Sequence, residues 1–564
     1  MTVAENPKSL PLPAMPPRPA RPLSTWQLLR VGFSNTLAAC DEEMFEELFV
    51  ERHYAWGRMF VINDPDGIKR VLQDNVDNYP RIDPIRRVFA FGSGSGMLCA
   101  EGEVWRRHRR ILNSTLDRRA VVADVPGLVA LAEELARRLD ELPGGEALNI
   151  GEMFTHFQTR ATGQVFAGDD RAIDPMVLRM GHYPGEYGLF DFLTMPRWLR
   201  FIDRFRKSSR EAKALHPLLA RMLAERREPG YRGPQDLLWR LANARDRQTG
   251  ESLSIAELED EVLTLGSTSV TSLQAYSWIW YLLALHPWAE ARVEAELDAV
   301  LGDGLPQADD LGRLVYLRKV VDEAMRLYPP LPVMLRAAAS DDLVCGRRIP
   351  RKSVVAVIPW VVHRHRKLWD DPDRFDPERF TPEAVAARSR YAYLPFSVGP
   401  HVCIGATLAM SEILITFAVL ARRFRFRLVP DQRIEPIAWT SLRPGRGIHM
   451  RVEKRSRSGA ARENSADAAA AAGLGLGPAC LYQPPKYPQR GRVLTRRPSP
   501  PMRQRIPRCR AARNGHSPHP NCCGSRCRAR SPRSTKNCST SRSSSAALSG
   551  VGSLWSATPT ASAA

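Results

Sequence analysis

Cys403 stands between Gly399 and Gly405, in a turn-forming stretch that runs directly into an apolar pattern with helical spacing. A glycine-rich turn that opens a helix points its backbone N–H groups at whatever lies over the turn. A thiolate at this place meets hydrogen-bond donors and the positive end of the helix, which lower the pKa of the cysteine and tune the sulfur as a metal ligand. The stretch therefore predicts a metal-binding thiolate, and a buried cysteine in an ordinary turn is the alternative.

The loop around this cysteine has the spacing Phe-x-x-Gly-x-His-x-Cys-x-Gly, formed by Phe396, Gly399, His401, Cys403 and Gly405 and continued by Leu408 and Glu412. It resembles the haem-binding loop of the cytochrome P450 family. The resemblance implies that Cys403 is the axial thiolate ligand of haem b, a ligand that favours O–O cleavage, and that Phe396 lies at the haem. His401 stands where many members have Arg and some have His, both able to donate to a haem propionate. Ser397 and Met410 replace a common Gly and a common Arg of the pattern.

Trp105 and Arg109 are four residues apart and therefore share one face of a predicted helix. On the residues alone, a solvated basic helix is an equal alternative. The pair resembles the Trp-x-x-x-Arg of P450s, whose side chains contact the haem propionates, and a guanidinium fork suits a carboxylate. Arg336 matches the second propionate arginine of the family. We expect the neighbouring arginines to point outward, toward an acidic electron donor; they are Arg106, Arg107 and Arg110.

An acid and a base, Glu323 and Arg326, are three residues apart in another predicted helix. Alone, such a pair is a common exposed contact worth about 0.3–0.5 kcal/mol. Together with Arg379, the pair resembles the Glu-x-x-Arg of P450s and its partner arginine, which form a buried structural network behind the haem loop. The run that precedes this arginine in the family is matched by His363, Trp369 and Pro372.

The helix predicted over 255–285 departs from the family at one place. In P450s the corresponding helix crosses the oxygen-binding face of the haem and carries an acid followed by Thr, which relay protons. Counting back from the end of the helix places that threonine at Thr271, and Val270 then occupies the acid position. We expect Thr271 to act in oxygen activation, with the hydroxyls of Thr268, Ser269 and Thr271 itself ordering a water chain. The alternative is that these hydroxyls only bond back to helix carbonyls.

The positive charge of the chain is concentrated near its C-terminus. The net charge is +20, and the segment 455–564 holds 19 Lys and Arg against two Asp and Glu, so that it carries 17 of these charges. An argument for nucleic-acid binding therefore applies to this tail alone. The tail cannot bury enough apolar surface to fold, and we expect a disordered basic segment without function. Polyanion binding is the alternative, whereas the tail's Cys and His residues match no paired zinc pattern.

The remaining chain divides into a proline-rich lead-in, residues 1–22, and one body, residues 23–454, which the resemblance covers. Helical patterns dominate the body, over 128–142, 212–226, 255–285, 288–301 and 316–327, with a further helix through 71–72. Short strands are expected over 58–63, over 354–358 and after 424. The expected fold is mainly α with minor β-sheets, and the resemblance makes it the cytochrome P450 fold.

Four cysteines are scattered over the body, which indicates a reducing compartment; they are Cys40, Cys99, Cys345 and Cys403. The N-terminus has no signal-peptide pattern, and no apolar run reaches membrane-spanning length. We expect a soluble protein of the cytoplasm without a membrane anchor.

The resemblance implies a haem-thiolate monooxygenase that receives electrons from a separate ferredoxin or flavodoxin with its reductase and inserts one oxygen atom of O2 into an apolar small molecule. Family topology places several apolar side chains around that substrate, namely Phe89, Phe91, Val333, Met334 and those of 183–192, and they favour a fatty acid or a terpenoid, although each also fits a core position. With Val270 in the acid position, a P450-type peroxygenase or an isomerase-like haem enzyme without redox partner stays open. A haem protein that binds nucleic acid through its tail is a more distant alternative.

Overall fold

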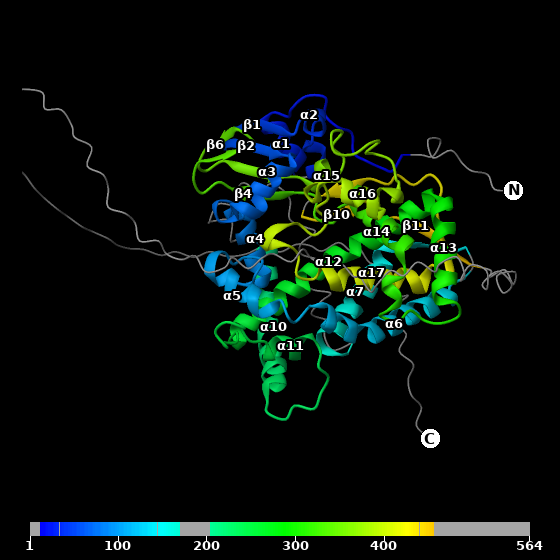
Figure 1. Ribbon diagram of the computed structural model, residues 1–564. Coiled ribbons are helices and arrows are strands. Elements are labelled where there is room, and N and C mark those ends of the chain that lie inside the picture. Colours follow the sequence, from blue (N-terminus) through cyan, green and yellow to red (C-terminus); the bar gives the residue numbers. More distant parts are fainter. Residues whose placement is uncertain (1–11, 33, 144, 170–202, 439, 456–564) are drawn as a thin grey trace, which may run out of the picture. The chain divides into compact units, whose positions relative to one another are not determined.

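The computed structural model describes residues 12–32, 34–143, 145–169, 203–438 and 440–455. Helices form most of this body and the sheets are small, which confirms the expected fold class (Figure 1). In the first half of the chain the helices are α1 (Thr25–Gly32), α2 (Glu42–Glu46), α3 (Pro65–Lys69), α4 (Asp83–Ser93), α5 (Gly102–Leu112), α6 (Arg118–Asp140) and α7 (Ile150–Ala167). In the second half they are α10 (Asp203–Arg227), α11 (Leu237–Asn243), α12 (Ile255–Leu285), α13 (Pro287–Leu301), α14 (Val315–Leu327), α15 (Pro359–Val362), α16 (Pro382–Ala387) and α17 (Ala406–Leu420).

The largest sheet in the described residues joins segments that are far apart in the sequence. Its strand order is β1 (Phe49–Tyr54), β2 (Gly57–Ile62), β7 (Val354–Val357) and β4 (Met334–Ala337). β1 and β2 form an antiparallel hairpin, β2 and β7 run parallel, and β4 is antiparallel to β7. The smaller sheets pair β3 (Ala147–Asn149) and β8 (Phe424–Leu428) with β11 (His449–Lys454), β9 (Pro436–Ala438) with β10 (Leu442–Pro444), and β5 (Asp342–Val344) with β6 (Arg347–Ile349). The large sheet thereby fixes the position of β4, the strand that carries Arg336.

Helix α12 has the ends that the sequence predicts. It begins where Ser254 and Glu257 form a capping box, in which each side chain accepts a hydrogen bond from the other residue's backbone N–H. It ends before Pro287, because the residue before a proline avoids helical geometry. The prediction over 255–285 is confirmed at both ends because both signals are local.

The C-terminal half of α12 forms the centre of the core, and its neighbours surround it (Figure 1). The Trp278 ring stacks on Tyr328 beyond the end of α14, with 4.0 Å between ring centroids, and the Trp280 ring stacks on Phe417 of α17 at 4.6 Å. Both tryptophans are fully buried. A helix that is apolar on every side is expected at such a central place.

Two helices are longer than their predicted segments. α6 starts at Arg118, ten residues before the predicted 128, and α10 starts at Asp203 rather than at 212. Each contains an internal proline, Pro126 in α6 and Pro217 in α10. Pro126 lies just before the segment predicted for α6, where a proline usually interrupts a helical pattern, but here packing supports the helix across it. Pro217 lies within the segment predicted for α10 and does not account for its earlier start. The helix expected through 71–72 is instead η3 (Arg70–Asp74), a π-helical turn that follows α3.

The described part of the proline-rich lead-in has no regular secondary structure and is fastened to the body. The N–H of Ala14 donates to the Tyr281 hydroxyl (3.1 Å), and the carbonyl of Ala14 accepts from the Tyr328 hydroxyl (2.8 Å). Arg18 forms an ion pair with Asp373 (2.5 Å). The lead-in therefore covers the ends of α12 and α14 in place of extending away from them.

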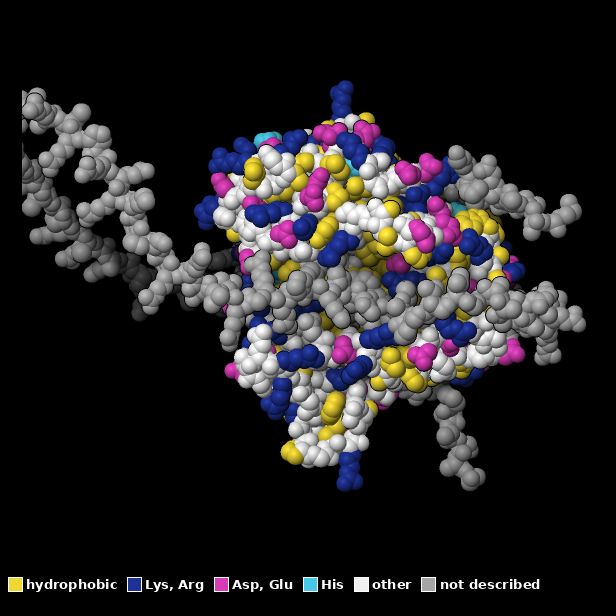
Figure 2. Space-filling view, in the orientation of Figure 1, with side chains coloured by type: hydrophobic (Ala, Val, Ile, Leu, Met, Phe, Trp, Pro, Cys, Tyr) yellow, Lys and Arg dark blue, Asp and Glu magenta, His cyan; other side chains and the backbone are white. Residues whose placement is uncertain are grey.

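Basic and acidic side chains are interspersed over the face of the molecule shown in Figure 2. This agrees with the near balance of charge that the sequence gives outside the tail. Among the helices of the described residues, none has the length and hydropathy that crossing a membrane requires.

Candidate active site

The cysteine loop lies between η9 (Gly399–His401) and helix α17. The N–H of Cys403 donates to the carbonyl oxygen of Phe396 (2.9 Å), which closes the loop on itself. The Phe396 ring is partly buried and packs against the core. α17 starts directly behind Gly405, so the first N–H groups of the helix lie beside the cysteine. The predicted arrangement, a cysteine at a glycine-framed helix start, is present.

The Cys403 thiol is accessible although protein atoms surround the loop closely. Burial raises the pKa of this thiol, while the backbone N–H of Gly405 and the charge of Arg109 act in the opposite direction. The sequence predicted a lowered pKa from the helix start alone, and that prediction is wrong for the free thiol because desolvation is the larger effect. A metal cation bound to the sulfur would favour the thiolate.

Four of the predicted site residues meet beside the loop. The rings of Trp105 and His401 lie 4.0 Å apart between centroids. Burial, followed by the charges of Arg81, Arg336 and Arg109, lowers the pKa of His401 to about 2. The predicted propionate residues are therefore gathered in one place, together with Arg81, which the sequence analysis did not single out.

Arg336 is the buried cation of this cluster. Its side chain is buried, with 8% exposed, and it forms no ion pair among the described residues. Its Nη1 atom donates to the neighbouring carbonyl of Leu335 (3.0 Å). Burial and the nearby charge of Arg81 lower the pKa of Arg336 to about 10. A buried guanidinium without a counter-charge is costly, so a ligand with carboxylates, such as the propionates of haem, fits the cluster.

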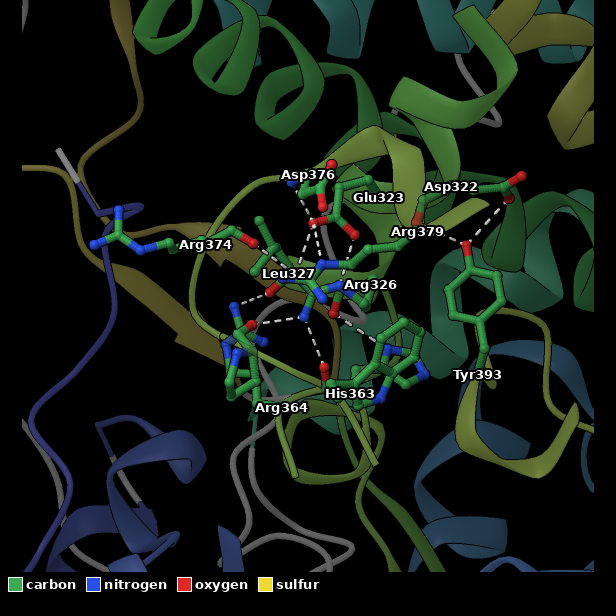
Figure 3. Close-up of polar contacts among 12 residues, drawn as sticks. Asp322, Glu323, Arg326, Leu327, His363, Arg364, Arg374, Asp376, Arg379 and Tyr393 are labelled. Atoms are coloured by element: carbon green, nitrogen blue, oxygen red, sulfur yellow. Dashed lines mark hydrogen bonds and ion pairs between the residues drawn. The ribbon is translucent and has the colours of Figure 1, made fainter. Parts of the chain in front are cut away.

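Behind the loop, Glu323 and Arg326 form a fully buried ion pair (Figure 3). The two carboxylate oxygens of Glu323 accept from Nε and Nη2 of Arg326 at 2.6 and 2.7 Å. Arg379 completes the predicted triad, with its Nε 3.7 Å from the same carboxylate. The remaining N–H groups of Arg326 donate to backbone carbonyls of His363, Pro372 and Arg374.

The network also fixes the chain that leads into the cysteine loop. The Nε2 atom of His363 accepts from the N–H of Leu394 (2.7 Å), and its Nδ1 atom is 3.2 Å from the carbonyl of Arg326. Since Nε2 must accept, the proton of the neutral ring is on Nδ1, where it is donated to that carbonyl. Burial holds the pKa of His363 well below its ordinary value. One imidazole thus joins α14 to the segment just before Phe396.

A family model described as Cytochrome P450 matches residues 16–451 of the chain. This chain belongs to the cytochrome P450 family. As a member, it is a haem-dependent monooxygenase.

Named relatives also support membership of the cytochrome P450 family, and a solved structure supports the fold. A putative cytochrome P450 132 from Mycobacterium tuberculosis is 31% identical over 475 residues, covering 77% of this chain and 96% of that protein. Cyclooctatin synthase from Streptomyces melanosporofaciens is 38% identical over 234 residues, 41% of this chain and 50% of that protein. Pentalenene oxygenase from Streptomyces avermitilis is 29% identical over 379 residues, 64% and 81% of the two chains. The crystal structure of the cytochrome P450DA haem domain has a TM-score of 0.66 at 22% identity, over 79% of this chain and 98% of that one, and shows the same fold.

In this P450, the hydroxyl groups near Thr271 bond back to the backbone of α12. Thr271 Oγ1 donates to the carbonyl of Thr268 (2.8 Å), and Ser269 Oγ donates to that of Gly266 (2.7 Å). Ser269 Oγ also accepts from Thr162 of α7 (3.2 Å). These bonds are the ones that the simpler interpretation of the sequence predicted. They leave lone pairs on each oxygen that can accept from water.

The three other arginines of α5 are engaged with acids of the same chain. The pairs are Arg106–Asp77 (2.6 Å), Arg107–Glu257 (2.7 Å) and Arg110–Asp246 (2.8 Å). The sequence predicts instead that they point toward an electron donor. Arg106 has a second, local partner in Glu103 (2.6 Å), but the acids that pair with Arg107 and Arg110 come from distant segments, so no pattern along the chain indicates that those two charges are already balanced.

Of the apolar residues expected at the substrate, Met334 is buried in a second hydrophobic cluster and Val333 packs against the main core. Phe89 is partly buried. The side chains of Phe91 and Val270, as well as the segment 183–192, lie outside the described residues.

Glu412 of α17 is a buried acid whose protonation state the sequence did not reveal. Only 4% of the residue is exposed, and its carboxyl group accepts a hydrogen bond from the side-chain amide of Gln158 (3.0 Å). Burial raises the pKa of Glu412 to about 8. The carboxyl group is therefore neutral at pH 7, which helps to explain how an acid is tolerated inside the core.

This raised pKa predicts a pH-dependent stability. Below the pKa of an unfolded glutamate, about 4.3, both states hold the proton; above it, only the folded state does, so stability falls as pH rises toward 8. We expect Glu412→Gln to remove this loss, and the difference in unfolding free energy between variant and wild type to grow by up to about 1.4 kcal/mol per pH unit between pH 5 and 8. Urea denaturation across this range measures it. The exposed Glu383→Gln is the control, and parallel pH profiles for Glu412→Gln and wild type would contradict the prediction.

Proposed function

We propose that this P450 oxygenates an apolar, terpenoid-like small molecule in the cytoplasm, with electrons delivered by a separate ferredoxin or flavodoxin and its reductase. One oxygen atom of O2 enters the substrate, and the other leaves as water with two protons and two electrons. The substrate class is supported by relatives that are named cyclooctatin synthase and pentalenene oxygenase. The observation that carries the chemistry is the Cys403 loop beside a cluster of arginines, of which Arg336 is buried.

In this proposal, Cys403 ligates the haem iron and the cluster holds the propionates. Arg109 and Arg336 supply charge, and Trp105 and His401 supply neutral N–H donors. When bound, haem supplies the metal centre at which O2 is activated. The Phe396 carbonyl keeps the cysteine N–H occupied and so fixes the loop's shape. The buried Glu323–Arg326 pair keeps the preceding segment in place.

The sulfur–metal bond is the first thing to test. We expect the holoprotein, once reduced under carbon monoxide, to show the absorbance band of a thiolate-ligated haem, and Cys403→Ser to lose that band together with turnover. Cys345→Ser, a change at an accessible cysteine away from the loop, is the control and keeps both. Wild-type protein that binds haem without a thiolate-type band would refute the proposal. Binding of cyclic terpenes, but not of polar analogues, detected by a shift of the Soret band, tests the substrate class.

We further propose that Thr271 holds a water molecule through which protons reach the reaction centre. Its hydroxyl already donates to Thr268, so the oxygen is left to accept from water. We expect Thr271→Ala to lower the product formed per electron consumed several-fold, with Thr271→Ser close to wild type. Product and NAD(P)H consumption measured together give this ratio. An unchanged ratio in Thr271→Ala would remove Thr271 from the mechanism.

A second function, a P450-type peroxygenase, is favoured by one observation. The residue before Thr271 is a valine, and the nearby hydroxyl protons are donated to the helix backbone. An enzyme supplied with peroxide takes its protons and electrons from the oxidant. Turnover with peroxide, and none with electron donor plus O2, would establish this alternative.

A further inference from the structure

Helix α12 carries a line of polar side chains along one side, although the helix is part of the main apolar core. The members of this polar stripe are three or four residues apart, so they fall within about 80° of one another around the helix axis. They are Glu257, Glu261, Thr264, Thr268 and Thr271. The stripe begins at Glu257, whose side chain is 32% exposed, and it ends at the threonine that the proposed function places at the reaction centre.

At the solvent end of the polar stripe, one imidazole lies between two carboxyl groups. Oε1 of Glu261 accepts from the N–H of Met97 (2.8 Å) and is 2.7 Å from Nδ1 of His108, a residue of α5. Nε2 of the same imidazole is 3.5 Å from Oε1 of Glu257. The Glu261 side chain is 0% exposed. His108 therefore connects an acid at the surface with an acid inside the core.

Polar atoms along this line are buried and have no hydrogen-bond partner among the described residues. They include Nε2 of His108, Oε2 of Glu261 and Oγ1 of Thr264. An ionised carboxylate oxygen that is buried without a donor is costly. Burial raises the pKa of Glu261, and the bond to His108 opposes this only in part. The surroundings of Glu261 therefore favour a neutral carboxyl group with its proton on Oε2.

The imidazole of His108 also holds a proton more firmly than a free histidine does. Burial lowers its pKa, but the hydrogen bond to Glu261 and the charges of Glu261 and Glu257 outweigh burial, so that the pKa of His108 is raised. The His108–Glu261 pair thus keeps a proton to higher pH than either group would alone. Its two outer atoms, Nε2 and Oε2, face opposite ends of the pair.

We propose that the His108–Glu261 pair supplies the protons that Thr271 delivers, and that the hydroxyl groups of the polar stripe carry them between. This rests on the proposed function, in which a valine stands before Thr271 and has no proton to give. A proton that reaches Nε2 of His108 lets the proton on Nδ1 move to Oε1 of Glu261, and the proton on Oε2 leaves toward Thr264. One proton enters, one leaves and no electron moves. Reorientation of both groups restores the starting arrangement.

The spacing of the polar stripe suits a transfer through water. Side chains three or four residues apart in a helix have Cβ atoms about 5–6 Å apart, a gap that one water molecule spans. Oγ1 of Thr268 donates to the carbonyls of Thr264 (3.0 Å) and Leu265 (3.1 Å), which leaves its lone pairs to accept from water. From Glu261 to Thr271 the helix rises about 15 Å.

The first test replaces the acid of the pair. Glu261→Gln keeps the shape of the side chain but has no carboxyl proton to release. With electron donor and O2, we expect it to form several-fold less product per NAD(P)H consumed and to release hydrogen peroxide instead. With added peroxide, which brings its own protons, its turnover should equal wild type. Glu259→Gln, which removes the acid of a similar pair with His216 on another side of α12, is the control and changes neither.

The second test changes the polar stripe and leaves the pair intact. Thr264→Val keeps the branched shape and removes a hydroxyl that has no partner in the described structure, so we expect a folded protein with several-fold less product per NAD(P)H. Thr264→Ser keeps the hydroxyl and should stay near wild type. A role in packing alone predicts the reverse order, because valine fills the site better than serine does.

Infrared spectra give a readout that does not depend on turnover. The difference between wild type and Glu261→Gln should contain the C=O band of a neutral carboxyl group, and this band should shift in D2O. Its absence overturns the proposal, as does a wild-type yield per NAD(P)H in Glu261→Gln or an equal loss with O2 and with peroxide. If Glu261→Gln does not load haem, the order of Thr264→Val and Thr264→Ser decides. Wild-type turnover with donor and O2 shows in each case that the proposed function stands, whereas turnover with peroxide alone would refute that function itself.

Discussion

Glu323→Ala is expected to lower the free energy of unfolding by about 3–5 kcal/mol, because it leaves a buried guanidinium without its carboxylate. Glu323 and Arg326 are both 0% exposed and are joined by two hydrogen bonds. The three carbonyl groups that also accept from Arg326 cannot neutralise its charge. Arg379, which faces the same carboxylate, loses its partner as well. Urea denaturation of the variant and the wild type measures the loss.

The matched control is a pair with the same spacing on the surface. Arg106 and Glu103 are also three residues apart, but their side chains are 37% and 83% exposed, respectively. We expect Glu103→Ala to cost less than about 1 kcal/mol. The haem content of purified Glu323→Ala should fall too, because the network fixes the segment that enters the cysteine loop. A loss of stability no larger than that of Glu103→Ala would show that the buried pair does not stabilise the fold.

The sequence revealed what depends on neighbours along the chain. The ends of α12 follow from a capping box and a proline, and the Cys403 loop follows from residues within ten positions of one another. The buried Glu323–Arg326 pair was identified for a different reason, since its spacing alone describes an exposed pair. The family resemblance predicted its burial, and the structure confirms it.

What the sequence could not reveal depends on contacts across the fold. Arg81 and His401 are 320 positions apart, and no pattern along the chain joins them. The parallel pairing of β2 with β7 sets the sheet in which β4, and so Arg336, is brought beside Arg81. The predicted direction of the Cys403 pKa shift was wrong for a related reason. The helix start is visible in the sequence, but the protein packed around the sulfur is not.

The conformation of the cysteine loop gives the last prediction. Gly399 has φ +75°, in the left-handed region, and a Cβ atom at this position would lie 2.0 Å from the carbonyl oxygen of Leu72 and 2.9 Å from its carbonyl carbon. Those are backbone atoms of η3 and cannot rotate away. Ser397 also has a positive φ, +62°, and its buried hydroxyl has no hydrogen-bond partner in the described structure. Position 399 therefore requires glycine, because a Cβ atom would overlap the backbone, whereas position 397 only favours it.

We expect Gly399→Ala to destabilise the protein by about 2–5 kcal/mol, since the left-handed conformation and the overlap with η3 both oppose it. The loop must then move, so the purified variant should contain little haem with thiolate ligation. Ser397→Gly, the control in the same loop, relieves strain and is expected to be neutral or to stabilise by up to about 1 kcal/mol. Thermal unfolding and the carbon monoxide band, measured for both, compare them directly. Gly399→Ala with wild-type stability and a full band would mean that the loop does not rest on η3, and the fixed position assigned here to Cys403 would have to be abandoned.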